Sequence, residues 1–276
     1  MKRLLIHHNY KKDSMAVKAR LLELMHQRGF QSVDDHPDVI VAIGGDGTML
    51  SAVRDHRNKK VPFIGINTGS LGFLPNVRPD NMGGFLDALE QETYHLQSYP
   101  MLKVICKTVL GEQVESYAFN EILIKHLEPR LMEAKIIING KPFNYFTGDG
   151  FIISTPLGAT GYAIWAGGVA THSELPVYQL TPLNPNDNSI NRPLKTSMVV
   201  PLETEIDFNI IKASSREVIV ACDGCKVSND YISELHIRAS RQEITFLRLE
   251  NYDYFEFYKS KIIDKNISRS VNGPEA

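Results

Sequence analysis

The feature that most constrains the fold is a continuous apolar run, Val39 to Ile43, that leads directly into a glycine-rich loop. Such a β-branched run is typical of a strand buried on both faces of a parallel sheet. The loop at residues 44–48 reads GGDGT, and helical spacing follows from about Thr48 to Arg57. Glycines there let the backbone turn sharply and approach a ligand closely. The pattern predicts one strand–loop–helix unit of an open α/β sheet.

The residues around this unit predict more of the same architecture. Arg3 to His8 and Phe63 to Asn67 have strand character. A helix is predicted with Ser14 as its N-cap and Gly29 as its stop, and another from Pro79 to about Leu89. The resulting βαβα order predicts an N-terminal, Rossmann-like α/β domain over residues 1–99.

The pattern changes after Pro100, and residues 100–251 are predicted to form a mainly β domain, a sandwich or a related two-sheet structure. One segment, Gly158 to Thr171, has helical character, and the Pro/Asn-rich stretch Thr181 to Pro193 is predicted to be a long loop. The polar tail, residues 268–276, is expected to fray. The predicted strands are rich in Ile, Val, Phe and Thr and cover Leu102–Val109, Glu121–Lys125, Ala134–Ile138, Phe151–Ser154, Ser197–Val200, Ile206–Ile211, Glu217–Ala221 and Ile244–Leu249.

Charge and composition argue against several classes of function. The chain has 30 basic and 32 acidic residues and no dense basic block, which disfavours a nucleic-acid partner. The N-terminal apolar run Leu4 to Ile6 is too short for a signal peptide, and no stretch is long enough for a membrane span, so we expect a cytoplasmic protein without a membrane partner. Cys222 and Cys225 end a strand and have no second ligand pair, which disfavours zinc or redox chemistry.

The glycine loop itself suggests phosphate chemistry. The helix after it presents free N–H groups and a positive dipole end, and Asp46 lies at the carboxyl end of a parallel strand, where open α/β sheets bind ligands. The loop lacks the lysine of a P-loop and does not match GxGxxG. A tight turn with an exposed Asp46 is the structural alternative for this loop taken alone.

Further strings add to this signal. GINTGSLGFL at residues 65–74 is a second strand exit, expected beside the first, in which Phe73 either stacks on a flat ring or simply packs. Asn120-Glu121 enters a strand, and residues 148–162 read GDGFIISTPLGATGY. The hydroxyls and glycines of residues 148–162 suit a flat slot with a few directed hydrogen bonds, such as an adenine requires. Last comes the Cys222–Cys225 turn, CDGC.

The GGDGT string is shared by NAD kinases, diacylglycerol and sphingosine kinases and, more loosely, 6-phosphofructokinases. The ordered set from Val39 to Gly224 resembles the NAD kinase family in particular. The resemblance implies an N-terminal α/β domain, a C-terminal β-sandwich-like domain with NAD in the cleft between them, and a last segment, residues 252–276, that returns to the first domain. It also implies a homodimer or homotetramer.

The resemblance further implies roles for individual residues. Asp46 would be the catalytic carboxylate that accepts the proton of the NAD ribose 2′-hydroxyl as this oxygen attacks the γ-phosphorus of ATP, giving NADP. A divalent metal ion, Mg²⁺ or Mn²⁺, would accompany ATP, and no residue of the chain is assigned to a metal site. Donor phosphates and the dinucleotide would be bound by Gly45, Gly47, Thr48, Phe73, Asn120, Glu121, Asp149, Ser154, Thr155, Thr160, Gly161, Tyr162, Asn186 and Asp223.

The chain departs from the family pattern at Thr147, Ala159, Gly161 and Cys225, which bears on affinity and acceptor selectivity more than on reaction class. Two other functions stay open at this point. A lipid kinase would share GGDGT but would have no reason to carry the strings at residues 65–74 and 148–162. A non-catalytic NAD-binding regulator would not need Asp46. The choice between ATP and polyphosphate as donor is also open.

Overall fold

The computed structural model describes residues 2–69, 72–187, 192–249 and 253–263 and divides the chain into two compact units. Unit 1 combines residues 1–98 with residues 245–276, and unit 2 comprises residues 99–244. The last described segment contains a short helix, α5 (Tyr254–Tyr258), and a π-helical turn, η4 (Lys259–Ile263). The predicted fraying tail lies outside the described residues. No helix in the described part of the chain is long and apolar enough to span a membrane.

Unit 1 contains a parallel sheet with strand order β2-β1-β3-β4. Phe246, near the end of the long strand β16 (Ile232–Leu249), pairs in parallel with Phe63 of β4. The strands are β1 (Arg3–His8), β2 (Gln31–Ser32), β3 (Val39–Gly44) and β4 (Phe63–Asn67). The helices are α1 (Lys12–Gln27), α2 (Asp46–His56), η1 (Arg57–Lys59), η2 (Pro79–Asn81) and α3 (Met82–Gln91).

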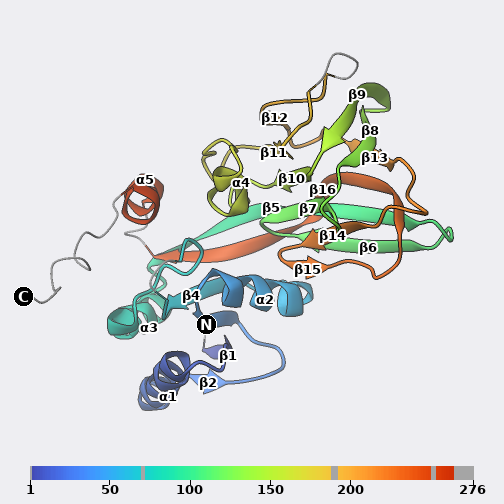
Figure 1. The fold of residues 1–276 in the computed structure, drawn as a ribbon. Helices are drawn as coiled ribbons and strands as arrows, with labels where there is room; N and C mark the ends of the chain where they lie inside the picture. Colours follow the sequence, from blue (N-terminus) through green and yellow to red (C-terminus); the bar gives the residue numbers. More distant parts are fainter. Residues whose placement is uncertain (1, 70–71, 188–191, 250–252, 264–276) are drawn as a thin grey trace, which may run out of the picture. The chain divides into compact units, whose positions relative to one another are not determined.

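Both faces of this sheet are covered, as the apolar sequence of β3 predicts. All six residues of β3 are buried. Val39, Val41 and Ile43 share a core cluster with Leu21 of α1 and Phe85 of α3. The alternate residues of a strand point to the opposite face, where α2 packs on β3 and buries its own apolar side chains. Figure 1 shows α1 and α2 on opposite sides of this sheet.

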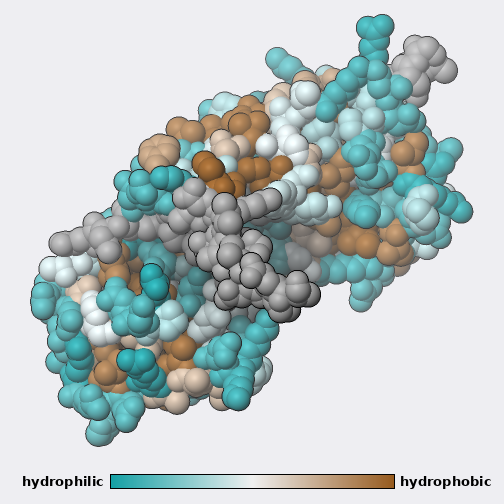
Figure 2. Space-filling model, turned by 60° about the vertical axis from the view of Figure 1, so that its left-hand side comes forward, coloured by the Kyte–Doolittle hydropathy of each residue, from teal (hydrophilic) through white to brown (hydrophobic). Residues whose placement is uncertain are grey.

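Unit 2 is a β-sandwich, as the sequence predicted. One sheet has the order β12-β11-β10-β7-β14-β15, and in the other β16 pairs with β5 and β13, β13 with β8, β8 with β9, and β5 with β6. Rings from both sheets interleave in the core: Phe151 of β10 contacts Phe146 of β9 and Phe208 of β13. Outside the cores, hydrophilic side chains alternate with smaller hydrophobic patches, as the face in Figure 2 shows. The strands and short helices are β5 (Tyr94–Thr108), β6 (Gln113–Ala118), β7 (Glu121–His126), β8 (Met132–Ile138), β9 (Lys141–Gly148), β10 (Gly150–Ser154), η3 (Gly158–Thr160), α4 (Tyr162–Trp165), β11 (Val177–Leu183), β12 (Met198–Pro201), β13 (Ile206–Ile210), β14 (Val218–Cys222) and β15 (Cys225–Lys226).

Three local predictions were wrong. Ser14 is not the N-cap of α1, because the helix begins at Lys12 and the Ser14 hydroxyl instead contacts the Thr68 hydroxyl at 2.7 Å. The helix predicted for Gly158–Thr171 is reduced to η3 and α4, because Gly161 interrupts it with ψ −129° and Gly167 ends it with φ 87°. The first residues of the predicted long loop, from Thr181 on, belong to β11, which pairs with β10. Residues 188–191 of that loop lie outside the described residues.

Candidate active site

The first part of the candidate site lies in unit 1, where β3 ends and α2 begins. Gly45 precedes α2 in an extended conformation, and Asp46 is the first residue of the helix. A Cβ on Gly44 would lie 2.1 Å from Thr48 Oγ1, so a larger residue at this position would displace the first turn of α2. The GGDGT loop therefore folds as the strand–loop–helix unit that its sequence predicts.

Asp46 is held from the next strand exit. The Phe73 N–H donates to both carboxylate oxygens of Asp46, at 2.7 and 2.9 Å, and the Leu74 N–H donates to Oδ1 at 2.7 Å. Hydrogen bonds from N–H groups to a carboxylate are about twice as strong as those between neutral groups. Asp46 is therefore fixed in orientation, and it ties the loop after β4 to the start of α2.

The exits of three neighbouring strands are linked by short polar contacts. The Thr68 N–H, just after β4, donates to Gly44 O at 3.3 Å. Asn9, just after β1, donates its Nδ2 hydrogen to Thr48 Oγ1 at 3.0 Å. The sequence interpretation did not single out Asn9, although an Asn directly after a buried strand is the same signal that drew attention to Asp46. Thr48 is buried, and its hydroxyl is engaged in this network.

The Phe73 ring packs within unit 1. Only 7% of the residue is exposed, and its ring meets those of Tyr254 and Tyr258 edge-on at centroid distances of 6.1 and 6.3 Å. This favours the packing alternative for Phe73 over stacking on a ligand.

A histidine pair lies beside the same helix. His7 Nδ1 is 3.3 Å from His56 Nε2, and His7 Nε2 is 2.6 Å from the Ser51 hydroxyl of α2. Burial lowers the pKa of His7, and the neighbouring His56 lowers it further. Burial also lowers the pKa of His56. Burial against α2 therefore disfavours the protonated form of both imidazoles.

The second part of the candidate site lies in unit 2 and is organised by Asp223. Asp223 and Gly224 form the two-residue turn between β14 and β15, with φ values of 47° and 78°. Hairpin turns of this kind require positive φ at both positions and prefer Asp-Gly or Asn-Gly. The Asp223 carboxylate accepts the N–H groups of Phe119, Asn120 and Glu121 at 2.7, 2.8 and 3.0 Å. The CDGC turn thereby holds the Asn-Glu pair in place.

Asn120 and Glu121 present buried polar atoms that lack hydrogen-bond partners. Asn120 Oδ1 and Glu121 Oε2 are both inaccessible to solvent and unbonded in the described structure. Burial raises the pKa of Glu121 to about 7, and the Asp223 carboxylate acts in the same direction. Because unsatisfied buried polar groups are rare and costly, these two atoms suggest a ligand that would complete them. A Cβ on Gly161 would lie 3.3 Å from Glu121 Oε2, so the backbone there closes the same small space.

The segment after β10, residues 155–158, is hydrogen-bonded to the backbone at and just before the Asn-Glu pair. The Thr155 hydroxyl donates to Phe119 O at 2.7 Å and accepts the Gly158 N–H at 3.1 Å. A Cβ on Gly158 would lie 2.1 Å from Asn120 O, so only glycine fits there. Thr155 is buried and engaged with the backbone in this arrangement.

The other residues of this segment differ in accessibility. Ser154 is fully buried, and its hydroxyl has no hydrogen-bond partner in the described structure. The Thr160 hydroxyl donates to Leu157 O at 2.9 Å, at the start of η3. Tyr162, by contrast, is 46% exposed, so its ring is open to a ligand.

Asp149 and Asn186 lie apart from this group. Asp149 precedes β10, whereas the Asn-Glu pair lies beside the far end of that strand, where Ser154 pairs with Glu121. At about 3.4 Å per residue the two ends of β10 are roughly 15 Å apart. Asp149 Oδ2 accepts a hydrogen bond from Asn184 at 2.7 Å, and the exposed Asn186 contacts Thr147 through its backbone.

The cysteines show no sign of special chemistry. Cys222 and Cys225 pair across the hairpin but form no disulfide, and neither does Cys106. Burial raises the pKa of the Cys222 thiol to about 12, which keeps it protonated at neutral pH. No group of three or more His, Cys, Asp or Glu side chains suited to a metal ion occurs in the described part of the chain.

Comparison with known proteins assigns both halves of the chain to one family. Residues 4–94 match the model for the ATP-NAD kinase N-terminal domain, and residues 119–249 match that for the ATP-NAD kinase C-terminal domain. An NAD kinase of Lactobacillus gasseri is 31% identical over 96% of this chain and 97% of its own length. One from Leuconostoc mesenteroides is 29% identical over 94% and 98%, respectively.

Solved structures agree with these matches. An NAD kinase from Archaeoglobus fulgidus, in complex with ATP, has a TM-score of 0.71 and 26% identity, covering 90% of this chain and 94% of its own. A yeast NADH kinase complexed with NADH has a TM-score of 0.81 and covers 100% of this chain and 90% of its own; at 17% identity it supports the fold alone.

Proposed function

We propose, since the chain belongs to the ATP-NAD kinase family, that it transfers the γ-phosphoryl group of ATP to the 2′-hydroxyl of the adenosine ribose of NAD, with Asp46 as the base. In this step the bond between the ribose oxygen and the γ-phosphorus forms and the bond from that phosphorus to the departing ADP oxygen breaks. The hydroxyl proton moves to the Asp46 carboxylate. The products are NADP and ADP.

The placement of Asp46 is the observation that carries this proposal. It begins α2 at the carboxyl end of β3, and two backbone N–H groups fix its carboxylate. An alcohol is a poor nucleophile at neutral pH, and a positioned base typically accelerates such a step by about 10²–10⁴-fold. We assign the donor phosphates to the first turn of α2, Gly45 to Thr48, because a helix N-terminus favours anions.

We assign dinucleotide recognition to Asn120, Glu121 and their surroundings in unit 2. Asn120 Oδ1 would accept a hydrogen bond from an N–H or O–H group of the ligand. Glu121, with a pKa near 7, would donate when protonated and accept when ionised. Tyr162 supplies an accessible ring beside them.

The residues fit a metal that arrives with the nucleotide better than a metal held by the protein. The described residues offer no cluster of ligands, and Mg²⁺ in such enzymes commonly keeps several waters and binds substrate phosphates with one or two carboxylates. When bound, Mg²⁺ or Mn²⁺ would neutralise charge on the triphosphate. A cytoplasmic location, which is expected from the sequence, and a homodimeric or homotetrameric state, which the family resemblance implies, are part of the same proposal.

The test is the formation of NADP from NAD and Mg-ATP by purified Asp46→Asn and by a matched control, Asp55→Asn. The amide introduced by Asp46→Asn retains an oxygen that can accept the Phe73 and Leu74 N–H groups but cannot take the proton. We expect saturated turnover to fall by about 10²–10⁴-fold, with the NAD dissociation constant little changed. The control lies on the same helix and is 45% exposed, so we expect it to stay within about twofold.

Three outcomes would count against the proposal. Turnover near that of the wild type at saturation would remove Asp46 from catalysis. Recovery of the rate at high Mg²⁺ and ATP would make Asp46 a phosphate anchor instead. Phosphorylation of diacylglycerol or a long-chain base, without NADP formation, would favour a lipid kinase.

A further inference from the structure

A cavity of about 410 Å³ opens on unit 2, among residues of three adjacent strands, β6, β5 and β16. On β5, Leu102 and Val104 are buried in the sandwich core, so Lys103 between them points to the opposite face of the sheet. The same alternation on β16 buries Ile237 and turns Arg238 outward. The cavity is lined by Lys103, Tyr117, Arg238, Ser240, Arg241 and Gln242. None of these residues belongs to the proposed reaction site.

The positive charge around this cavity exceeds the negative charge. Lys103 forms an ion pair with Glu115 at 2.5 Å, and the Tyr117 hydroxyl also bonds to Glu115. Arg238 and Arg241 take part in no ion pair with any residue that the structure describes. Arg238 is close enough to contribute to the lowered pKa of Glu115. Three cationic side chains therefore line the cavity, and the carboxylate of Glu115 forms an ion pair with one of them, Lys103.

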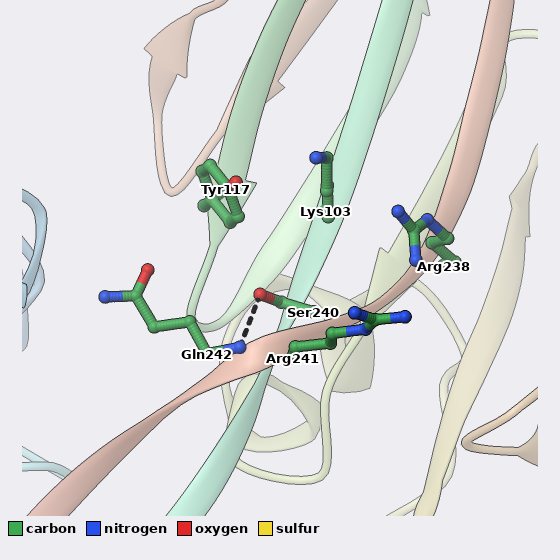
Figure 3. Close-up of a pocket in the computed structure, with 6 residues that line it drawn as sticks. All are labelled: Lys103, Tyr117, Arg238, Ser240, Arg241 and Gln242. Atoms are coloured by element: carbon green, nitrogen blue, oxygen red, sulfur yellow. Dashed lines mark hydrogen bonds between the residues drawn. The ribbon is translucent and has the colours of Figure 1, made fainter.

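Both arginines line the cavity although they lie three residues apart on β16. In a regular strand Arg241 would point to the face opposite Arg238, toward the side that buries Ile237. The Gln242 N–H instead donates to the Ser240 hydroxyl at 2.9 Å, and Arg241 is exposed. Figure 3 shows Arg238 and Arg241 on one side of Ser240, with Tyr117 and Gln242 on the other and Lys103 above. The strand thus presents two guanidinium groups and a hydroxyl together.

We propose that this cavity binds the phosphate group of a small phosphorylated molecule, at a site separate from that of the kinase reaction. Guanidinium groups bind phosphate through paired N–H donors, and the Ser240 hydroxyl, which accepts the Gln242 N–H, can still donate a neutral hydrogen bond at the border of the cavity. The cavity volume lies in the range of small-molecule sites, which suits a metabolite better than a flat macromolecular surface.

The experiment titrates inorganic pyrophosphate into the purified full chain by calorimetry, without divalent metal. The test variant is Arg238→Gln/Arg241→Gln. The matched control is Lys135→Gln/Lys141→Gln, which removes the same charge from exposed lysines of β8 and β9. We expect the test variant to lose about tenfold or more in affinity and the control to stay within about twofold, because each charge-assisted contact contributes substantially.

Two further measurements complete the test. Arg238→Lys/Arg241→Lys keeps the charge but not the paired donors, and we expect it to bind with an affinity between those of the wild type and the Gln variant; melting temperatures check that all variants fold. Without pyrophosphate, the Gln variant should keep its KM for ATP and its turnover within about twofold.

Unchanged pyrophosphate affinity in the Gln variant, or an equal loss in the lysine control, would show that the anion binds elsewhere or through net charge alone. A rise of about tenfold in the KM for ATP would place these arginines in the donor site. Because the titration needs no turnover, its failure is distinguishable from failure of the proposed kinase function.

Discussion

Replacing Glu121 with Gln should stabilise the protein while weakening its ligand site. The Glu121 carboxyl is largely buried, its Oε2 atom has no partner in the described structure, and its pKa is raised to about 7 from an ordinary value of 4.5. Each pKa unit corresponds to about 1.36 kcal/mol, so ionising this group in the folded protein costs about 3 kcal/mol more than in the unfolded chain. Gln has nearly the same size and carries no charge to desolvate.

The sign of the pH dependence follows from proton binding. Below about pH 4.5 the carboxyl is protonated in both states, and its contribution to stability is intact. Between about pH 4.5 and 7 the folded state keeps the proton that the unfolded chain has released, so stability falls as pH rises. Above about pH 7 the full penalty applies. We therefore expect Glu121→Gln to match the wild type near pH 4.5 and to gain about 3 kcal/mol at about pH 8, a rise in melting temperature of roughly 6–12 °C.

Thermal melts of wild type, Glu121→Gln and the exposed control Glu203→Gln, across this pH range, test the expectation. A gain for Glu121→Gln that does not grow with pH would refute the assigned origin of the penalty, as would an equal gain in the control. Calorimetry with NAD on the same samples should show a loss of affinity of about tenfold or more above about pH 7, because Gln cannot replace the ionised carboxylate as a charged acceptor with two oxygens.

Gly161→Ala should fold and should change NAD affinity by less than about tenfold by calorimetry, because the added methyl group, at 3.2 Å from Gly158 O and 3.3 Å from Glu121 Oε2, requires its neighbours to shift by only a few tenths of an ångström; an unfolded or inactive variant would contradict this. Changing both Cys222 and Cys225 to Ser should keep most NADP-forming activity and release no zinc, and stoichiometric metal in the native protein would overturn that expectation. The lowered pKa values of His7 and His56 mean that the unfolded chain binds more protons below about pH 6.5, so the contribution of this pair to stability should fall as pH drops below that value, opposite in sign to the contribution of Glu121. This fall should shrink in a double Gln variant, and melts with an unchanged pH slope would contradict it.

The strands predicted most accurately are those with strong apolar runs. Arg3–His8 and Phe63–Asn67 match β1 and β4, and Val39–Ile43 differs from β3 by one residue. β3 and β4 lie inside a parallel sheet that is covered on both faces, so nearly every residue of these two strands is buried and apolar. In contrast β9, Lys141–Gly148, was not predicted, because it is mostly exposed and owes its conformation to pairing with β8.

The motifs predicted which residues form the candidate site but not how the structure holds them. Asp46 bonds to backbone groups 27 and 28 residues further along the chain, and Asp223 to groups 102 to 104 residues earlier. Pairings at such separations depend on strand order, which periodicity does not reveal. Ser154 and Thr155 are both buried in the structure, and their predicted contacts with a ligand stay a prediction.

The carboxylates of Asp46 and Asp223 make the same kind of contact with the backbone, and this affects how substitutions at either position should be interpreted. Each carboxylate lies at a turn and accepts backbone N–H groups from a distant loop, so each positions a segment in addition to any chemistry. Removing an acceptor leaves buried N–H groups unpaired, at about 1–3 kcal/mol each. An Ala variant of Asp46 would therefore combine the loss of a base with displacement of the Phe73–Leu74 loop, and its rate would not separate the two. Asn keeps an acceptor and removes the base, so the Asn variant, and not the Ala variant, isolates the chemical role.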